Sequence, residues 1–271
     1  MNRTEIADII VQKLEANLPS MKKMYDQSEP AIGYFYIDDL LPEEIAQKIY
    51  SCFPDGSNMR LKKSLKEYKY IAAQMNNYNP ILEEAIYAFQ DPRVVELVSK
   101  ITGIKSLNPD EHLYAGGISL MGNKHYLNPH LDNSHDKDRD QWRVLNLLYY
   151  VTPQWDEKFG GNLELWPNGL DAGQTTIHSK FNRLAVMATH DDSWHSVSPI
   201  DAEGKARCCV SNYYFSKTAL KSTDRFHITS FRGRPDQKVR DAVLKVDIAL
   251  RMAVRKVFKK GIVENKHVYK K

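Results

Sequence analysis

The chain has 271 residues, of which 42% are apolar, 27% charged and 10% aromatic. This composition excludes a disordered chain, a collagen-like repeat and a low-complexity segment, and the length is sufficient to bury a substantial core. The net charge is only +4, but the excess lies in the tail, where Arg251–Lys271 holds eight basic residues and one acidic residue.

A basic tail of this kind can contact nucleic acid, anionic lipid or an acidic partner protein. No aromatic or glycine-rich recognition pattern accompanies the charges, so we expect a solvated helix face and no nucleic-acid partner. The longest apolar runs, such as Leu147–Val151, are far shorter than the roughly 20 residues that a membrane-spanning helix needs. We therefore expect no membrane span.

Cysteine usage and the first residues indicate a compartment. Cys208 and Cys209 are adjacent, so on a strand they would point to opposite faces, and with Cys52 they cannot build a disulfide framework. The first 18 residues alternate apolar and charged side chains at helical spacing, unlike a secretory signal. We therefore expect a mature cytoplasmic protein.

The first third of the chain is expected to be largely helical. Its apolar residues recur at helical spacing, Pro42 suits the first turn of a helix, and Gly103 suits a helix C-terminus. The expected helices cover residues 4–18, 42–53, 80–89 and 92–102, and a strand covers 33–38.

From Tyr114 onward the pattern changes to short runs rich in aromatic and β-branched residues, separated by turns such as DAEGK. Six or seven strands at this spacing are typical of a β-sandwich, jelly roll or barrel. A last amphipathic helix is predicted over residues 236–259, and no internal repeat or flexible linker divides the chain. We expect a single α+β domain with a mainly β core. Helical support would cover residues 1–113, the core 114–217 and a C-terminal extension 218–271.

One pair of side chains suits metal binding. In NPHLDN, His130 and Asp132 are two residues apart, so on a strand both leave the same face and can bind one ion. A third ligand must come from elsewhere, and His195 in SWHSVSPI lies on a later strand that a jelly roll could bring opposite. Two histidines and one carboxylate, with open positions, suit redox-active non-haem Fe(II).

A second pair with the same spacing shows that the motif alone is weak evidence. His190 and Asp192 in THDDSWH also lie two residues apart, but they fall in a polar turn between two predicted strands. Choosing His130 and Asp132 leaves His195 free as the distant partner. We therefore favour His130, Asp132 and His195 as the metal ligands.

A strand further along the chain indicates an anion site. In RCCVSNYYF, Arg207 and Ser211 share one face of the predicted strand. An inward-facing arginine needs an anion, and its planar guanidinium binds a carboxylate at two points. The Ser211 hydroxyl can add a further hydrogen bond.

These residues carry a family resemblance. Residues 117–217 resemble the prolyl-hydroxylase-like branch of the Fe(II)- and 2-oxoglutarate-dependent dioxygenases, with an H-x-D motif, a distal histidine and an arginine opening the next strand. The stretches LLYYVTPQWDEKFGGNLELWP and KFNRLAVMATHDDSWHSVSPI also resemble the family. The first third and the tail resemble it less, and the turn DAEGK between His195 and Arg207 is longer than in the family.

The resemblance implies a double-stranded β-helix, a cupin-like jelly roll, with supporting helices before and after it. It also implies a catalytic Fe(II) centre that uses 2-oxoglutarate and dioxygen, with ascorbate as a candidate reductant. The implied iron ligands are His130, Asp132 and His195. The implied cosubstrate contacts are Arg207, Tyr150, Ser211 and Tyr126.

The implied reaction hydroxylates an unactivated C–H bond and releases succinate and carbon dioxide. Relatives that halogenate have a small residue where Asp132 stands, so the carboxylate implies hydroxylation. A prolyl residue of a peptide is the first expected substrate, but free amino acids, sugars and natural-product scaffolds remain open because a fold does not determine a target.

Two other functions remain open from the sequence. A cupin-like binding or sensing module would bind metal without oxidation and would not need Arg207. A nucleic-acid demethylase would use the basic tail, but the remainder of the chain is close to neutral. Salt-dependent retention on DNA would distinguish the demethylase, because phosphate binding weakens steeply with salt.

Overall fold

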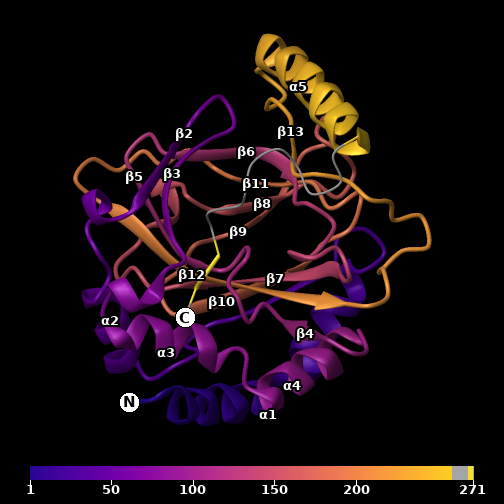
Figure 1. Ribbon diagram of the computed structural model, residues 1–271. Coiled ribbons are helices and arrows are strands. Elements are labelled where there is room, and N and C mark those ends of the chain that lie inside the picture. The colour runs from indigo at the N-terminus through magenta and orange to yellow at the C-terminus, as the bar shows by residue number, and fades with distance from the viewer. Residues whose placement is uncertain (258–267, 271) are drawn as a thin grey trace.

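The computed structural model describes residues 1–257 and 268–270. Four helices gather at one end of the molecule beneath a curled β-sheet, and a fifth helix of the described chain lies at the opposite end (Figure 1). The helices are α1 Arg3–Ser28, α2 Glu43–Ser51, α3 Pro80–Ala88, α4 Pro92–Thr102 and α5 Lys238–Val257.

Helix α1 is longer than predicted. The prediction ended it at Leu18, whereas the helix continues through Pro19 as far as Ser28. A proline inside a helix removes a hydrogen-bond donor and costs about 3 kcal/mol. Met21 and Tyr25 of the added part are buried, so tertiary packing outweighs this local cost.

The other predicted helices of the first third are confirmed to within two residues at each end. Helices α3 and α4 each begin with a proline, and the side chains of Asn79 and Asp91 before them accept hydrogen bonds from backbone N–H groups of the first turn. Helix α4 ends at Gly103, whose φ of 73° lies in the left-handed region.

The largely helical interpretation of the first third omitted two strands. Strands β2 (Arg60–Lys63) and β3 (Glu67–Ala72) form an antiparallel hairpin, and β3 continues the main sheet. Their side chains are nearly all exposed or half-buried, so no alternation of apolar and polar residues announces them. Three further short strands, β4 (Asn108–Pro109), β9 (Thr175–Ile177) and β13 (Ser230–Phe231), were also not predicted.

The strands predicted after Tyr114 are confirmed, and the sheet they form is antiparallel throughout the described chain. Its order is β1-β10-β7-β12-β5-β3-β6-β11-β8-β9, so the sheet curls and brings late strands opposite early ones. The remaining strands are β1 Tyr34–Ile37, β5 Gly117–Gly122, β6 Tyr126–Leu131, β7 Trp142–Tyr150, β8 Leu163–Leu165, β10 Arg183–Ala188, β11 His195–Val197 and β12 Ala206–Ser216.

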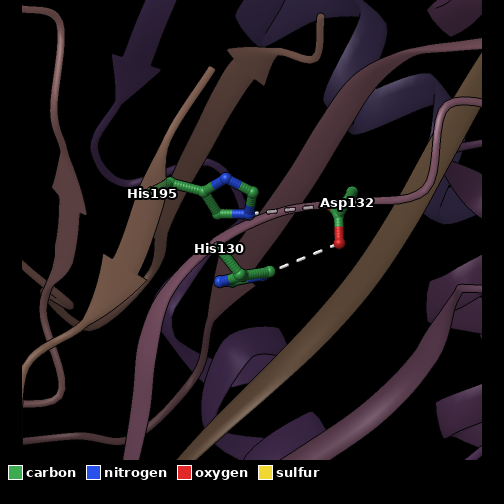
Figure 2. A group of neighbouring side chains, drawn as sticks. All are labelled: His130, Asp132 and His195. Atoms are coloured by element: carbon green, nitrogen blue, oxygen red, sulfur yellow. Dashed lines mark ion pairs between the residues drawn. The ribbon is translucent and has the colours of Figure 1, made fainter. Parts of the chain in front are cut away.

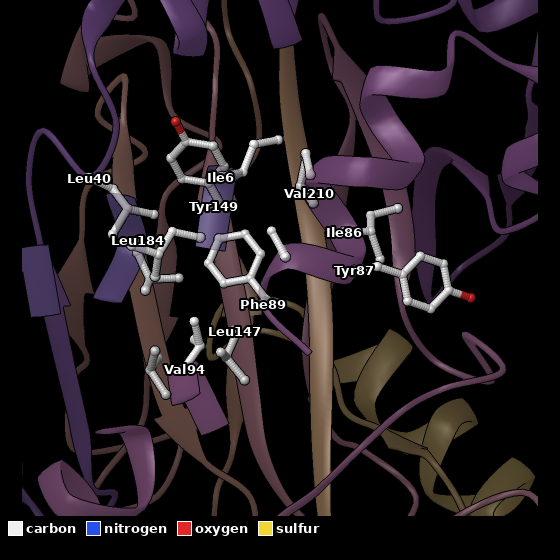
Figure 3. Packing of buried hydrophobic residues seen from close by; sticks show 14 of the residues in the cluster. Ile6, Leu40, Ile86, Tyr87, Phe89, Val94, Leu147, Tyr149, Leu184 and Val210 are labelled. Carbon is white, nitrogen blue, oxygen red and sulfur yellow. The ribbon is translucent and has the colours of Figure 1, made fainter. Parts of the chain in front are cut away.

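The main hydrophobic core lies between the helices and the outer face of the sheet. Figure 3 shows Ile6 of α1 and Val94 of α4 close to Leu147, Leu184 and Val210 of the central strands. Burying each such side chain contributes about 1.5 to 3 kcal/mol. The helices therefore brace the strands that carry the inner face.

The opposite faces expected for the adjacent cysteines are confirmed. Cys208 packs in the helix-facing core, whereas Cys209 packs with Tyr150 in a second cluster inside the curl. Both are free thiols, as is Cys52. Strand β12 therefore presents Cys208 to the helices and Cys209 to the interior of the jelly roll.

The C-terminal extension places α5 beside β13 (Figure 1). The helix was predicted to reach Lys259, but residues 258 and 259 lie outside the described residues, as do 260–267 and 271 of the basic tail. Among the described helices, none has an apolar stretch long enough to span a membrane.

Candidate active site

Two neighbouring strands bring the predicted histidines together. Strand β6 carries His130, strand β11 carries His195, and these two residues are direct partners in the antiparallel pairing. Asp132 follows β6 immediately, so its carboxylate reaches the same side. Figure 2 shows His130 and Asp132 on one backbone segment and His195 on another, with the three side chains pointing toward one another.

The three side chains surround a space suited to one ion. The Nε2 atoms of His130 and His195 each lie 3.6 Å from a carboxylate oxygen of Asp132, and the two imidazole rings are 4.1 Å apart. Both histidines are only 4% exposed. Ligand atoms from all three lie within 4.8 Å of one another, which is the spacing expected around a single cation.

Backbone carbonyls orient both histidines. Nδ1–H of His130 donates to the carbonyl of Asn128 at 3.0 Å, and Nδ1–H of His195 donates to the carbonyl of Ser193 at 2.9 Å. In a neutral ring this leaves the Nε2 lone pair free for a metal. Burial lowers the pKa of His130 to about 3, with a further contribution from His195, and burial also lowers the pKa of His195. The rings are therefore neutral, as metal binding requires.

The carboxylate of Asp132 is held in its ionised form. Burial alone would raise its pKa, but the charged guanidinium of Arg143 and a hydrogen bond from Asn146 keep the pKa well below its usual range. Nη1 of Arg143 lies 3.4 Å from Oδ2, and Nδ2 of Asn146 donates to the same oxygen at 2.8 Å. Two neutral imidazoles and an ionised carboxylate are the donor set that suits Fe(II).

The second pair with the same spacing lies elsewhere. His190 and Asp192 occupy the turn between β10 and β11, as predicted, and His190 is near Asp191 and Asp224. Nδ1 of His190 accepts a hydrogen bond from the backbone N–H of Asp192 at 3.2 Å. A neutral ring then carries its proton on Nε2, which makes this histidine a poor metal ligand.

A buried anion site lies inside the same curl. Arg207 is 4% exposed, donates through Nη1 to the carbonyl of Gly161 at 3.0 Å, and stacks 5.2 Å from the ring of Tyr150. Within the described chain, the guanidinium has no carboxylate partner, and both its Nε and the Tyr150 hydroxyl are buried without a hydrogen-bond partner. These orphaned donors fit a bound carboxylate.

Comparison with known proteins agrees with this geometry. Residues 116–215 match the family model of the 2OG-Fe(II) oxygenase superfamily. These residues form a 2OG-Fe(II) oxygenase domain. The resemblance of this segment to the Fe(II)- and 2-oxoglutarate-dependent oxygenases, seen in the sequence, is therefore confirmed. No curated protein sequence matches the chain.

The fold of the oxygenase is shared with solved prolyl hydroxylases. A Pseudomonas putida prolyl-4-hydroxylase superposes with a TM-score of 0.53 at 14% identity, covering 72% of this chain and 98% of its own. A Trichoplax adhaerens prolyl hydroxylase, solved with a hypoxia inducible factor peptide fragment, gives 0.53 at 19% identity, with coverages of 76% and 93%. A Phytophthora capsici prolyl 4-hydroxylase gives 0.53 at 16% identity, with coverages of 91% and 75%. These likenesses confirm the double-stranded β-helix.

The two weaker cosubstrate predictions are Tyr126 and Ser211. The Tyr126 hydroxyl donates to the carbonyl of Ser64 at 2.8 Å, and Arg240 of α5 lies over its ring. Ser211 is half-buried on β12, with its Oγ 3.8 Å from the thiol of Cys209. Both assignments stay predictions.

Sequence reasoning missed two side chains that contact Asp132. Arg143 and Asn146 lie on β7 and were not predicted as partners of Asp132. On a regular strand, residues three apart point to opposite faces, so this spacing does not predict that both contact one carboxylate. In the structure, an irregularity in the pairing of β7 with β12 interrupts the regular alternation. A buried arginine at the start of an apolar strand was the available clue.

A large cavity opens in front of the oxygenase site. Its volume is about 2170 Å³, and its wall includes Asp132, Arg143 and Tyr213. Leu250 of α5 and Tyr269 near the C-terminus also line it. The cavity thus reaches from the candidate metal centre to the C-terminal extension.

Proposed function

We propose that this oxygenase hydroxylates an unactivated C–H bond and releases succinate and carbon dioxide, with His130, Asp132 and His195 as its iron ligands. The observation that carries the proposal is the set of two neutral histidines and one ionised carboxylate gathered within 4.8 Å, beside an open cavity. When bound, iron and 2-oxoglutarate together activate dioxygen for C–H oxidation.

The protein's own residues prepare this chemistry. The carbonyls of Asn128 and Ser193 hold the two imidazole rings in one tautomer, which presents Nε2 toward Asp132. Asn146 and Arg143 keep the carboxylate charged and limit its rotation. Both histidines are buried, and reduced access of water strengthens each of these electrostatic interactions.

Arg207 and Tyr150 supply the contacts proposed for 2-oxoglutarate. The unpartnered Nε of Arg207 and the unpartnered Tyr150 hydroxyl would donate to the distal carboxylate of the cosubstrate. Gly161 makes room for this arginine, because a Cβ at that position would lie 3.1 Å from Cδ of Arg207. Ser211 and Tyr126 are retained as weaker proposed contacts.

We propose a peptidyl substrate, with a prolyl residue as the first choice. The cavity of about 2170 Å³ is larger than the roughly 300 to 1,000 Å³ typical of a small-molecule site. Its lining suits an extended chain that places one residue at Asp132 while the flanking residues contact α5 and the C-terminal residues. The Trichoplax adhaerens enzyme, which shares the fold, was solved with a bound peptide.

The remaining expectations follow from this assignment. We propose that residues 1–271 act as one catalytic domain, that ascorbate serves as reductant, and that the protein works in the cytoplasm. Three free cysteines among the described residues are consistent with a reducing compartment.

The proposed function is tested without a substrate. Fe(II) and then 2-oxoglutarate are added anaerobically, and the visible charge-transfer band is recorded for the wild type, His195→Ala and Arg207→Ala. Lys205→Ala, an exposed change two residues before Arg207, serves as the control. We expect the band in the wild type and the control, no band with His195→Ala, and a much higher cosubstrate requirement with Arg207→Ala.

Two results would contradict the proposal. If the protein binds one equivalent of iron but shows no charge-transfer band with 2-oxoglutarate, the proposed cosubstrate would be wrong. That result would favour a non-oxidative metal-binding module. If the band forms but no peptide in an aerobic screen yields succinate, the proposed peptidyl substrate would be wrong. The proposed Fe(II)/2-oxoglutarate centre would then still stand.

A further inference from the structure

Phe231 lies flat against one of the two candidate iron histidines. It belongs to β13, which pairs with β6 so that Phe231 is the direct partner of His130. The two rings stack with centroids 5.0 Å apart and planes 13° apart, and Phe231 is buried. This phenylalanine lies after residue 215, outside the matched oxygenase domain.

The same segment reaches the strand of the other histidine. Arg234 donates through Nη2 to Oε2 of Glu164 at 2.7 Å and to the carbonyl of Val197 at 3.0 Å. The hydroxyl of Ser196 donates to the same carboxylate oxygen at 2.6 Å. Ser196 and Val197 directly follow His195 on β11, and both Arg234 and Glu164 are largely shielded from solvent.

Strand β11 needs such support. It has only three residues, and its register with β6 shifts between His195 and Val197, so the regular ladder is interrupted beside the histidine. On its other edge, Ser196 pairs with Glu164 of β8. The buried ion pair of Glu164 with Arg234 therefore holds β11 where its own backbone pairing is weakest.

The segment is itself anchored at two points. The backbone N–H of Arg232 donates to the carbonyl of Pro129, next to His130, at 2.8 Å. The side chain of Arg232 makes two hydrogen bonds to Asp241 in the first turn of α5, and the N–H of Gly233 donates to the same carboxylate at 3.0 Å. Phe231 and Arg234 are thus presented from a segment fixed to β6 and α5.

We propose that residues 230–241, outside the matched domain, position both iron histidines: Phe231 sets the ring plane of His130, and Arg234 holds the strand of His195. The inference rests on the proposed function, because it takes these histidines as ligands. Both are positioning residues, since neither would touch the metal. Partners that orient ligands typically change metal affinity by about 10- to 100-fold.

The test measures metal affinity and a spectroscopic signature. Co(II) or Fe(II) is titrated anaerobically into the full chain carrying Phe231→Leu or Arg234→Gln, and the Fe(II)/2-oxoglutarate band is then recorded. Phe226→Leu is the matched control, because Phe226 stacks in the same manner on His135, which is not a proposed ligand. We expect Phe231→Leu and Arg234→Gln to weaken metal binding about 10-fold or more and to shift the band, and Phe226→Leu to leave both unchanged.

Conservative variants at the same two positions keep the test decisive if Phe231→Leu or Arg234→Gln folds poorly. Phe231→Tyr retains the flat ring and Arg234→Lys retains the charge, so each is expected to restore most of the affinity. Cooperative unfolding in EDTA verifies that each variant is folded. Wild-type affinity in both Phe231→Leu and Arg234→Gln would overturn the inference, whereas a wild type that binds no metal would instead overturn the proposed function.

Discussion

Arg143 places Nη1 3.4 Å from Oδ2 of Asp132, and both side chains are almost completely shielded from water. The guanidinium also lies 4.6 Å from the ring centroid of Tyr213. A charge pair in this setting keeps the carboxylate ionised whether or not a metal is bound. The carboxylate of Asp132 is therefore already ionised before a cation binds.

Removing this arginine is expected to destabilise the metal-free protein. Arg143→Met leaves Asp132 buried without its main counter-charge, and breaking a buried pair costs about 3 kcal/mol. Urea unfolding in EDTA would measure the loss, with Arg143→Lys as the charge-retaining control. Equal stability of Arg143→Met and the wild type would show that the pair contributes nothing to the apo protein.

The two H-x-D pairs of the chain permit a matched test of the metal centre. His130→Ala is expected to reduce Fe(II) affinity by more than about 100-fold, because it removes a ligand. His190→Ala removes an equally buried histidine whose Nδ1 is already engaged by Asp192, so affinity is expected to stay at the wild-type level. Anaerobic equilibrium dialysis would measure both, and a comparable loss in His190→Ala would move the centre to the other cluster.

Variants of the adjacent residues Tyr149 and Tyr150 distinguish an effect on cosubstrate binding from an effect on packing. Tyr150→Phe is expected to raise the 2-oxoglutarate Kd about 10-fold, because it removes one hydrogen bond to a charged group. Tyr149 points to the opposite face, where its hydroxyl donates to Oδ1 of Asn182 at 2.8 Å. Tyr149→Phe is therefore expected to lower stability by about 1 kcal/mol and to leave the Kd unchanged. Titration of the charge-transfer band would show whether the two variants differ in this way.

Stability is expected to fall in mild acid partly because of His125. Burial lowers the pKa of this imidazole, helped by Lys63, and the ring stacks on Tyr68 with centroids 3.8 Å apart. The unfolded chain has the ordinary pKa of about 6.5, so below that pH it binds more protons than the folded chain and is favoured.

The variant His125→Phe keeps a stacking ring and removes this titration. Its stability relative to the wild type is expected to increase as the pH falls from 7 to 5, by at most about 1.4 kcal/mol per pH unit. Urea unfolding at several pH values in EDTA would measure the difference. A difference that stays constant over this range would exclude His125 as a contributor.

The glycine at position 160 is required by close packing. Its φ is 76°, and a Cβ there would lie 2.1 Å from the carbonyl oxygen of Pro199. Gly160→Ala is expected to cost about 3 kcal/mol, whereas Gly169→Ala, with a similar φ of 83° and open space, should cost about 1 kcal/mol. Thermal unfolding of the two variants would test this, and equal losses would show that backbone strain alone matters.

Much of the site could be predicted from the sequence because its determinants are local. A strand alternates its side chains, so His130 and Asp132 had to share a side, and Cys208 and Cys209 had to separate. Proline and aspartate or asparagine at a helix start, and Gly103 at a helix end, act within one turn. The resemblance of residues 117–217 to the oxygenases then supplied the distal His195 and Arg207.

Tertiary structure alone decided the rest, because it depends on contacts between distant segments. Helix α1 continues through Pro19 since packing of Met21 and Tyr25 outweighs a local cost, and the hairpin of β2 and β3 forms by pairing with the sheet although its own pattern does not alternate. The pairing of β13 with β6 likewise has no local signal, since two residues cannot show a period. Phe231 could therefore be placed on His130 only once the sheet had curled.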